Sequence, residues 1–295
     1  MSIRLEMLQV ARLAPKLLGD STPLVEAFLQ SQFTRDGAGC DRVGRPDLYY
    51  TIFALAGLHA LQQPVDTERT GGFLRSFDNG ESLDFVHLGA LARCWAALEP
   101  LKPSETLKDA LLARLEAHRC PDGGYDAEIG APHGNAYGCF VALGAYQDLA
   151  RPQPVPLRMV QCLKFLETPD GAWANARGLK LGSTNATAAA VTLLQQLNLP
   201  IHPAVGEWLL ARLHPQGGFL AMPSAPLPDL LSTATTLHAL SCMEVDLPDQ
   251  AREKCLDFID SLWTNEGGFH GHWADEALDA EYTFYGLLAL GHLTR

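Results

Sequence analysis

The chain has 295 residues, of which 47% are hydrophobic, and a formal net charge of -12 at pH 7. This charge argues against a nucleic-acid-binding surface, which needs a basic stripe to neutralise phosphates. No apolar run reaches the roughly 18 residues of a membrane-spanning helix, and the first six residues lack the apolar core of a signal peptide. The seven cysteines form no C-x-x-C pair, so we expect reduced thiols and a cytoplasmic protein.

A short glycine motif recurs along the whole chain. Its second small residues are separated by 34, 52, 48, 46 and 50 positions, and a period near fifty is typical of one two-helix unit per repeat. The six copies therefore predict about six helical hairpins within a single all-α domain covering residues 1–295. The copies are Gly37-Ala38-Gly39, Gly71-Gly72-Phe73, Gly123-Gly124-Tyr125, Gly171-Ala172-Trp173, Gly217-Gly218-Phe219 and Gly267-Gly268-Phe269.

The first 20 residues contain an additional predicted helix, because Leu5, Leu8 and Leu13 recur with helical spacing. In the second repeat, only six residues separate Pro64 from the Gly71-Gly72 turn, too few for a leading helix. An exposed apolar groove would be costly at such a gap. We therefore expect the N-terminal helix to pack on the ring of repeats, with residues 4–18 in this gap.

The remaining predicted helices alternate between two types. Amphipathic helices are expected at 104–118, 156–167, 203–213 and 249–263. Each glycine motif is followed by a helix that is apolar almost all round, which predicts burial inside the fold. These inner helices are expected at 47–62, 84–98, 133–149, 184–197, 229–243 and 280–293. The pattern predicts an α/α toroid (an α6–α6 barrel) in which the inner helices all begin at one mouth of a central cavity.

The chain resembles the β subunits of protein prenyltransferases, within the wider prenyltransferase and squalene-cyclase repeat superfamily. The resemblance rests on the glycine motifs, Gln32 with Asp36-Gly37, Leu227-Pro228-Asp229 and the segment 279–283. It implies an α/α toroid around an apolar pocket for an isoprenoid. It also implies a helical protein partner like the α subunit of that family.

The resemblance does not extend to the zinc ligands of the family. These are an Asp and a Cys spaced D-x-C, followed by a His in the last repeat. Here Asp229 is present, but Leu231 and Tyr282 occupy the Cys and His positions. Leucine cannot bind zinc and a neutral phenol is a poor ligand, so no cofactor is expected at this site. The segment before Asp229 also lacks the diphosphate-binding cations of the family, and the D-x-D-D acid motif of squalene-type cyclases is absent there.

A second polar constellation lies at the predicted mouth. Asp84 and His87 share one helix face at i and i+3, and His133 begins a neighbouring inner helix. We consider Asp84, His87 and His133 as a catalytic or alternative zinc site. In the competing interpretation, Asp84 only caps its helix and His87 is a hydrogen-bonded wall residue. The predicted substrate-binding residues are Asp47, Tyr49, Tyr50, Phe85, Tyr137, Asp229 and Tyr282.

Three functional hypotheses follow from these patterns. The favoured one is a prenyltransferase-like protein whose cavity holds an isoprenoid or other apolar chain as substrate or cargo, and it predicts an aromatic-walled pocket of roughly several hundred Å³. The second is a catalytically inactive toroid that acts as a protein-interaction scaffold. The third is a redeployed metal-dependent enzyme at the Asp84, His87 and His133 cluster.

Overall fold

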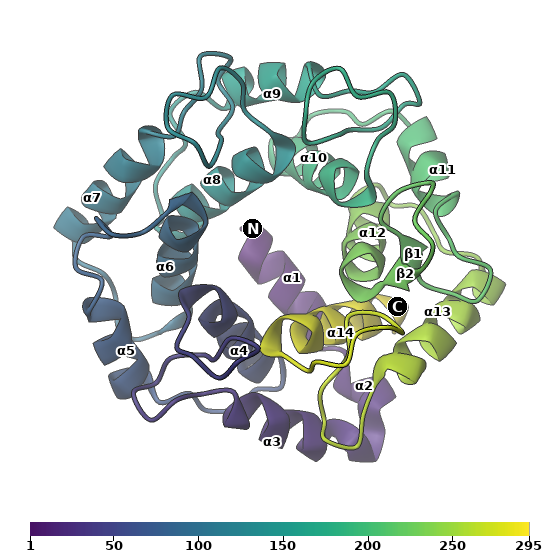
Figure 1. The fold of residues 1–295 in the computed structure, drawn as a ribbon, viewed down its shortest axis with the longest axis horizontal. Helices are drawn as coiled ribbons and strands as arrows, with labels where there is room; N and C mark the ends of the chain where they lie inside the picture. Colours follow the sequence, from purple (N-terminus) through teal and green to yellow (C-terminus); the bar gives the residue numbers. More distant parts are fainter. Residues whose placement is uncertain (295) are drawn as a thin grey trace.

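Two concentric rings of helices form the body of the protein in a computed structural model that describes residues 1–294 (Figure 1). The predicted α/α toroid is confirmed. The inner ring comprises α4 (Leu48–Ala60), α6 (Phe85–Ala97), α8 (Ala136–Asp148), α10 (Thr184–Gln196), α12 (Leu230–Cys242) and α14 (Ala280–Leu293). The outer ring comprises α3 (Thr22–Ser31), α5 (Thr67–Arg75), α7 (Glu105–Glu116), α9 (Pro156–Lys164), α11 (Ala204–Leu210) and α13 (Asp249–Leu262).

The inner ring closes on itself. Each inner helix packs against the preceding and the following one, and α14 returns to contact α4. Their outward faces bury residues such as Leu91, Leu193 and Leu288, which are completely inaccessible to solvent. The apolar character of these helices on all sides therefore has two causes, because one face packs on the outer ring and the other faces the centre.

The glycine motif forms a tight turn between the outer and inner helices. Gly217 adopts a φ of 97°, and a Cβ atom at this position would lie 1.9 Å from the Lys254 carbonyl oxygen, so only glycine fits. The aromatic residue that follows is held by the inner helix, because the backbone N–H of Phe219 donates to the Thr233 hydroxyl at 2.9 Å. A two-stranded antiparallel pair, β1 (Phe219–Leu220) with β2 (Pro228–Asp229), extends the turn in this repeat.

The second repeat departs from the predicted pattern. Gly71 and Gly72 do not form a turn but lie inside α5, which starts where the Asp66 side chain accepts a hydrogen bond from the Arg69 backbone N–H. This short helix occupies the outer-ring position that the sequence indicated to be empty (Figure 1). The predicted gap does not exist, and the placement of residues 4–18 in it is wrong.

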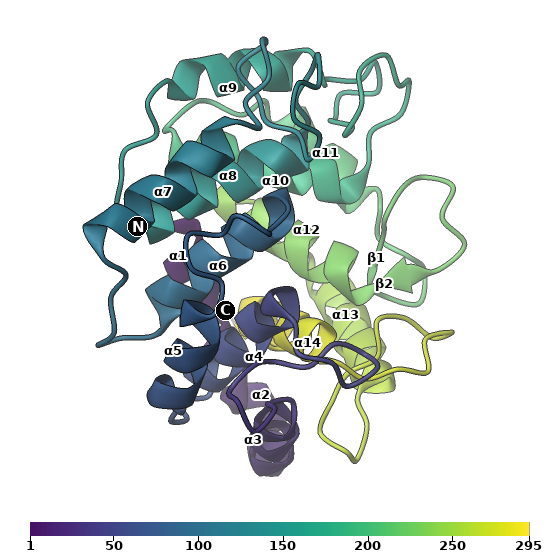
Figure 2. The same ribbon diagram turned by 60° about the vertical axis from the view of Figure 1, so that its left-hand side comes forward.

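The N-terminal helix α1 (Ile3–Ala11) instead lies across the end of the ring at which the inner helices terminate (Figures 1 and 2). It contacts α4, α8 and α14. Its first backbone N–H, at Ile3, donates to the Gln147 side chain at 2.9 Å. The helix therefore covers one opening of the toroid, and α2 (Pro15–Leu18) with the 3-10 helix η1 (Gly19–Ser21) connects it to α3.

All seven cysteines are free thiols, as the sequence predicted. Within residues 1–294, none of the helices combines the length and the apolar character that a membrane span requires.

Candidate functional site

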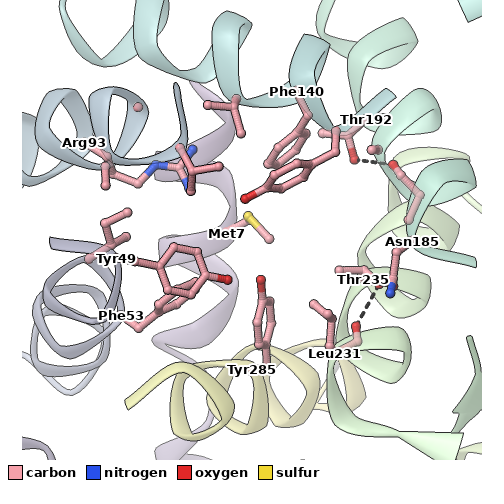
Figure 3. Close-up of a pocket in the computed structure, with 18 of the residues that line it drawn as sticks. Met7, Tyr49, Phe53, Arg93, Phe140, Asn185, Thr192, Leu231, Thr235 and Tyr285 are labelled. Carbon is pink, nitrogen blue, oxygen red and sulfur yellow. Dashed lines mark hydrogen bonds between the residues drawn. The ribbon is translucent and has the colours of Figure 1, made fainter. Parts of the chain in front are cut away.

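A cavity of about 330 Å³ occupies the centre of the inner ring. All six inner helices and α1 contribute to its wall, and the side chains project from every side toward the middle (Figure 3). Aromatic rings form much of the surface. They belong to Tyr49, Phe53, Tyr137, Phe140, Phe284 and Tyr285.

The wall residues follow the repeat. The second residue of each inner helix from α4 to α12 lines the cavity near its mouth, and the equivalent residue of α14 is Glu281. Residues seven positions later in α6, α10 and α12 lie two helical turns, about 10 Å, deeper. The mouth positions are Tyr49, Val86, Tyr137, Asn185 and Leu231, and the deeper ones are Arg93, Thr192 and His238, beside Met7 of α1.

A phenol and a carboxyl group meet at the mouth. The Tyr49 hydroxyl lies 2.6 Å from a Glu281 carboxyl oxygen. Burial, with the negative charge of Asp279 adding to it, raises the pKa of Glu281 to about 7, although the Tyr49 hydrogen bond and Arg42 act in the opposite direction. Burial also raises the pKa of Tyr49, which therefore remains a protonated donor. This pair can hold and release a proton near neutral pH.

An arginine lies at the deeper level of the wall. Arg93 projects from α6 into the cavity (Figure 3), and its Nε donates to an Asp148 carboxyl oxygen at 3.2 Å. The other oxygen of Asp148 accepts from Arg4 Nε of α1 at 3.0 Å. Gly144 leaves room for the guanidinium, because a Cβ atom there would lie 2.9 Å from Arg93 Nη2.

The rim aspartates chosen from the sequence are helix caps. Asp47, Asp84 and Asp229 accept hydrogen bonds from backbone N–H groups in the first turns of α4, α6 and α12. Each carboxylate is therefore directed at its own helix, in the N-cap geometry that satisfies otherwise unpaired donors. The capping interpretation of Asp84 describes this geometry.

His87 lies between two of these carboxylates. Its Nδ1 is 2.8 Å from Asp84 and its Nε2 is 3.5 Å from Asp47. Burial alone would lower the pKa of His87, but the hydrogen bond and charge of Asp84, with Asp47, outweigh it and raise the pKa. His133 precedes the helix cap Asn135 by two residues, and its Nδ1 lies 3.9 Å from the Asp122 carboxylate.

The metal alternative is not supported by this arrangement. Throughout residues 1–294, no group of three or more His, Cys, Asp and Glu side chains is placed to hold a metal ion. Asp84, His87 and His133 do not converge as the sequence-based alternative required, since His133 is paired elsewhere.

The residues at the family zinc position do not fit zinc either. Asp229 accepts two hydrogen bonds of 2.7 Å from the backbone and side chain of Ser232. Leu231 offers no donor atom, and the Tyr282 ring lies beneath the Arg42 guanidinium, 5.2 Å from its centroid. A site made of a helix-capping carboxylate, an alkyl group and a ring facing a cation lacks the thiolate and imidazole ligands that a zinc site of this kind requires.

Two of the predicted substrate-binding residues, Tyr49 and Tyr137, line the cavity. The other five lie outside its wall. Phe85 is completely buried between helices against Tyr125 and His118, and Tyr50 packs against the edge of Tyr49. Asp47, Asp229 and Tyr282 have the capping and cation contacts described above.

Sequence reasoning missed Glu281, Arg93 and Tyr285. A simple signal distinguishes the first two. Together with Asp148, they are the only Asp, Glu, Lys or Arg residues in the six inner helices as bounded in the structure. A charged residue inside an otherwise apolar helix needs a partner or a function.

The fold and the cavity define a toroid of the prenyltransferase type, and the comparison of sequences agrees. The family described as the prenyltransferase alpha-alpha toroid domain matches residues 9–88 and 186–294, which together make up more than half of the chain. The chain belongs to this family. A comparison with curated proteins found no match.

Solved structures with the same fold include enzymes of different chemistry. The type II terpene cyclase MstE from Scytonema has 16% sequence identity and a TM-score of 0.63, over 94% of this chain and 97% of that chain. A single-residue variant of this cyclase, in complex with geranylgeranyl dihydroxybenzoate, has 18% sequence identity and a TM-score of 0.63, over 95% of this chain and 97% of that chain. The α-1,6-mannanase GH76A from Salegentibacter has 13% sequence identity and a TM-score of 0.56, over 93% of this chain and 98% of that chain. At these identities the similarity shows the fold alone.

Proposed function

We propose that the central cavity binds an isoprenoid or another apolar chain of similar size. The observation that carries the proposal is the wall itself, in which aromatic rings from α4, α8 and α14 surround a cavity of about 330 Å³ whose surface is mostly apolar. This volume lies within the range of small-molecule pockets. Transfer of an apolar chain from water into this cavity is favourable by about 25 cal/mol per Å² of apolar surface buried.

The family and the neighbouring structures support the same class of ligand. The chain belongs to the prenyltransferase toroid family, and the MstE cyclase with this fold was solved with a geranylgeranyl compound. The mannanase with the same fold was solved with a mannotriose. The apolar wall favours the first kind of ligand for this protein, because a sugar requires many more polar partners.

Equilibrium binding tests this function. Geranylgeraniol, a C20 isoprenoid alcohol, would be delivered from cyclodextrin and titrated calorimetrically into the purified protein. We expect one saturable site with a negative heat-capacity change, the robust sign of apolar burial. No saturable binding by the wild-type protein would overturn the proposal.

Two variants locate the site. Ala189 of α10 faces the cavity, so Ala189→Trp fills it and is expected to abolish binding, with Ala189→Leu intermediate. Ala113→Trp on the exposed side of the outer helix α7 is the matched control and should bind like the wild type. Undiminished binding by a folded Ala189→Trp variant would exclude the central cavity as the site.

A further inference from the structure

We propose that Arg93 anchors the head group of the ligand, and that the ligand is an apolar-chain monocarboxylate. This inference rests on the proposed function, since it concerns which end of an apolar chain lies deep in the cavity.

The Arg93 guanidinium has N–H donors that are not used in hydrogen bonds within the part of the protein that the structure describes. Only its Nε is engaged, by Asp148, and within residues 1–294 no hydrogen bond involves its two Nη groups. Its side chain is 20% exposed, and it belongs to the cavity wall. An arginine fork with two free amino groups matches the two oxygens of a planar carboxylate.

The charges around Arg93 do not balance. Asp148 is 1% exposed and is the shared partner of Arg93 and Arg4, so two guanidinium groups face one carboxylate and a single positive charge remains. No other Lys or Arg occurs in the six inner helices. One positive charge suits a monoanion, whereas a diphosphate carries more negative charge than this end of the cavity could neutralise.

The two ends of the cavity favour one orientation of the ligand. Arg93 lies at the deeper level beside Met7, whereas Glu281 lies at the level of the mouth next to Tyr49. A carboxylate at the mouth would meet an acidic group of like charge, and at the deep end it meets a cation. Between the two levels, Phe53, Val141 and Phe284 offer only apolar surface to the chain.

The test compares matched C20 ligands that differ only in the head group. Geranylgeranoic acid, its methyl ester and geranylgeraniol would each be titrated into the wild-type protein at pH 8. We expect the acid to bind about 10- to 100-fold more tightly than the alcohol or the ester, the range of a hydrogen bond to a charged group. A straight-chain C16 fatty acid in a parallel titration distinguishes a fatty acid from an isoprenoid acid as the source of the carboxylate.

Substitutions assign the preference to Arg93. Arg93→Gln should remove the preference, so that the acid and the alcohol bind this variant with affinities within about 3-fold of each other, and Arg93→Lys should retain part of the preference. Arg114→Gln on the outer helix α7 is the charge-matched control and should keep the full preference. The carboxyl ¹³C signal of bound [1-¹³C]-labelled acid, followed from pH 5 to pH 8, should report an ionised carboxylate to lower pH in the wild type than in Arg93→Gln.

The outcomes separate this inference from the proposed function. Equal affinities for acid and alcohol in the wild type, or a preference that survives in folded Arg93→Gln, would overturn the head-group assignment while apolar binding stands. Failure of all four ligands to bind would overturn the proposed function and this inference together.

Discussion

The Tyr49 hydroxyl donates a 2.6 Å hydrogen bond to the Glu281 carboxyl group across the junction between the first and last inner helices. Both residues occupy the second position of their helices, so the same site in the first and last repeats supplies the two partners. The pair thus joins the ends of the repeat array at the mouth of the cavity. It also places a titrating group beside the proposed ligand site.

The pH dependence of folding should report this carboxyl group. The pKa of Glu281 is about 7 in the folded protein, against an ordinary value of 4.5, so the folded state binds more protons than the unfolded state between these values. Its stabilising contribution is complete below pH 4.5 and is lost as pH rises through 7. The free energy of unfolding of Glu281→Gln should therefore exceed that of the wild type by up to about 3 kcal/mol at pH 8, and by little at pH 4.5.

Urea unfolding followed by circular dichroism at these two pH values measures the difference. Glu253→Gln on the exposed face of the outer helix α13 controls for the loss of one negative charge. If Glu281→Gln and the wild type lost the same stability between pH 4.5 and pH 8, the carboxyl group would not titrate as described.

Arg42 should stabilise the same junction from the first repeat. It pairs with Asp279 at 2.6 Å and Asp275 at 3.0 Å, and Asp279 is 1% exposed. Arg42→Ala leaves that buried carboxylate without its cation and should lower the free energy of unfolding by about 2 kcal/mol. This loss is smaller than for a fully buried pair, because Arg42 is itself 34% exposed.

Arg45→Ala in the same loop provides the matched control. Arg45 is 77% exposed and pairs within its own loop with Asp41, so its removal should cost less than about 0.5 kcal/mol. Chemical denaturation at pH 7 compares the two variants, and equal losses of stability would show that Arg42 does not hold the junction.

The attachment of α1 depends on a glycine in α14. A Cβ atom at Gly291 would lie 2.1 Å from the Val10 carbonyl oxygen, so Gly291→Ala should displace α1 or destabilise the fold by about 1–3 kcal/mol. Hydrogen exchange of the backbone amides of residues 3–11 should accelerate in this variant. Unchanged protection of these amides would contradict the close packing of α1 on α14.

Gly72 should respond in the opposite direction. It lies on the exposed face of α5, and a Cβ atom added there would meet nothing within 4 Å. Alanine is about 1 kcal/mol better than glycine inside a helix, so Gly72→Ala should raise the free energy of unfolding by about 0.5–1 kcal/mol. A loss of stability measured by thermal unfolding would instead indicate a turn at this position.

The rings could be predicted from the sequence because two signals agree. The glycine motif marks each reversal, and the helix after it is apolar on every face, as in α10 with Ala188, Val191 and Leu194. The second repeat misled this reasoning, because its Gly71-Gly72 pair has the motif but lies in a helix capped by Asp66. Glycine permits a turn without requiring one.

The cavity wall could not be predicted with the same accuracy. A helix that is apolar all round has no stripe to show which residue faces the centre, so the polar residues at the start of each helix were chosen instead. Those residues, such as Asp84 and Asp229, cap their own helices. Aligning the six repeats on the second residue after each cap would have added Glu281 to Tyr49 and Tyr137.

The central claim is that an apolar chain occupies the middle of the inner ring. A crystal structure of the protein with geranylgeraniol tests it most directly. We expect continuous ligand density between Phe53, Val141 and Ala189, with Met7 of α1 at its closed end. Density confined to the outer surface, or a centre in which these side chains have collapsed onto one another and leave no room for the chain, would contradict the account.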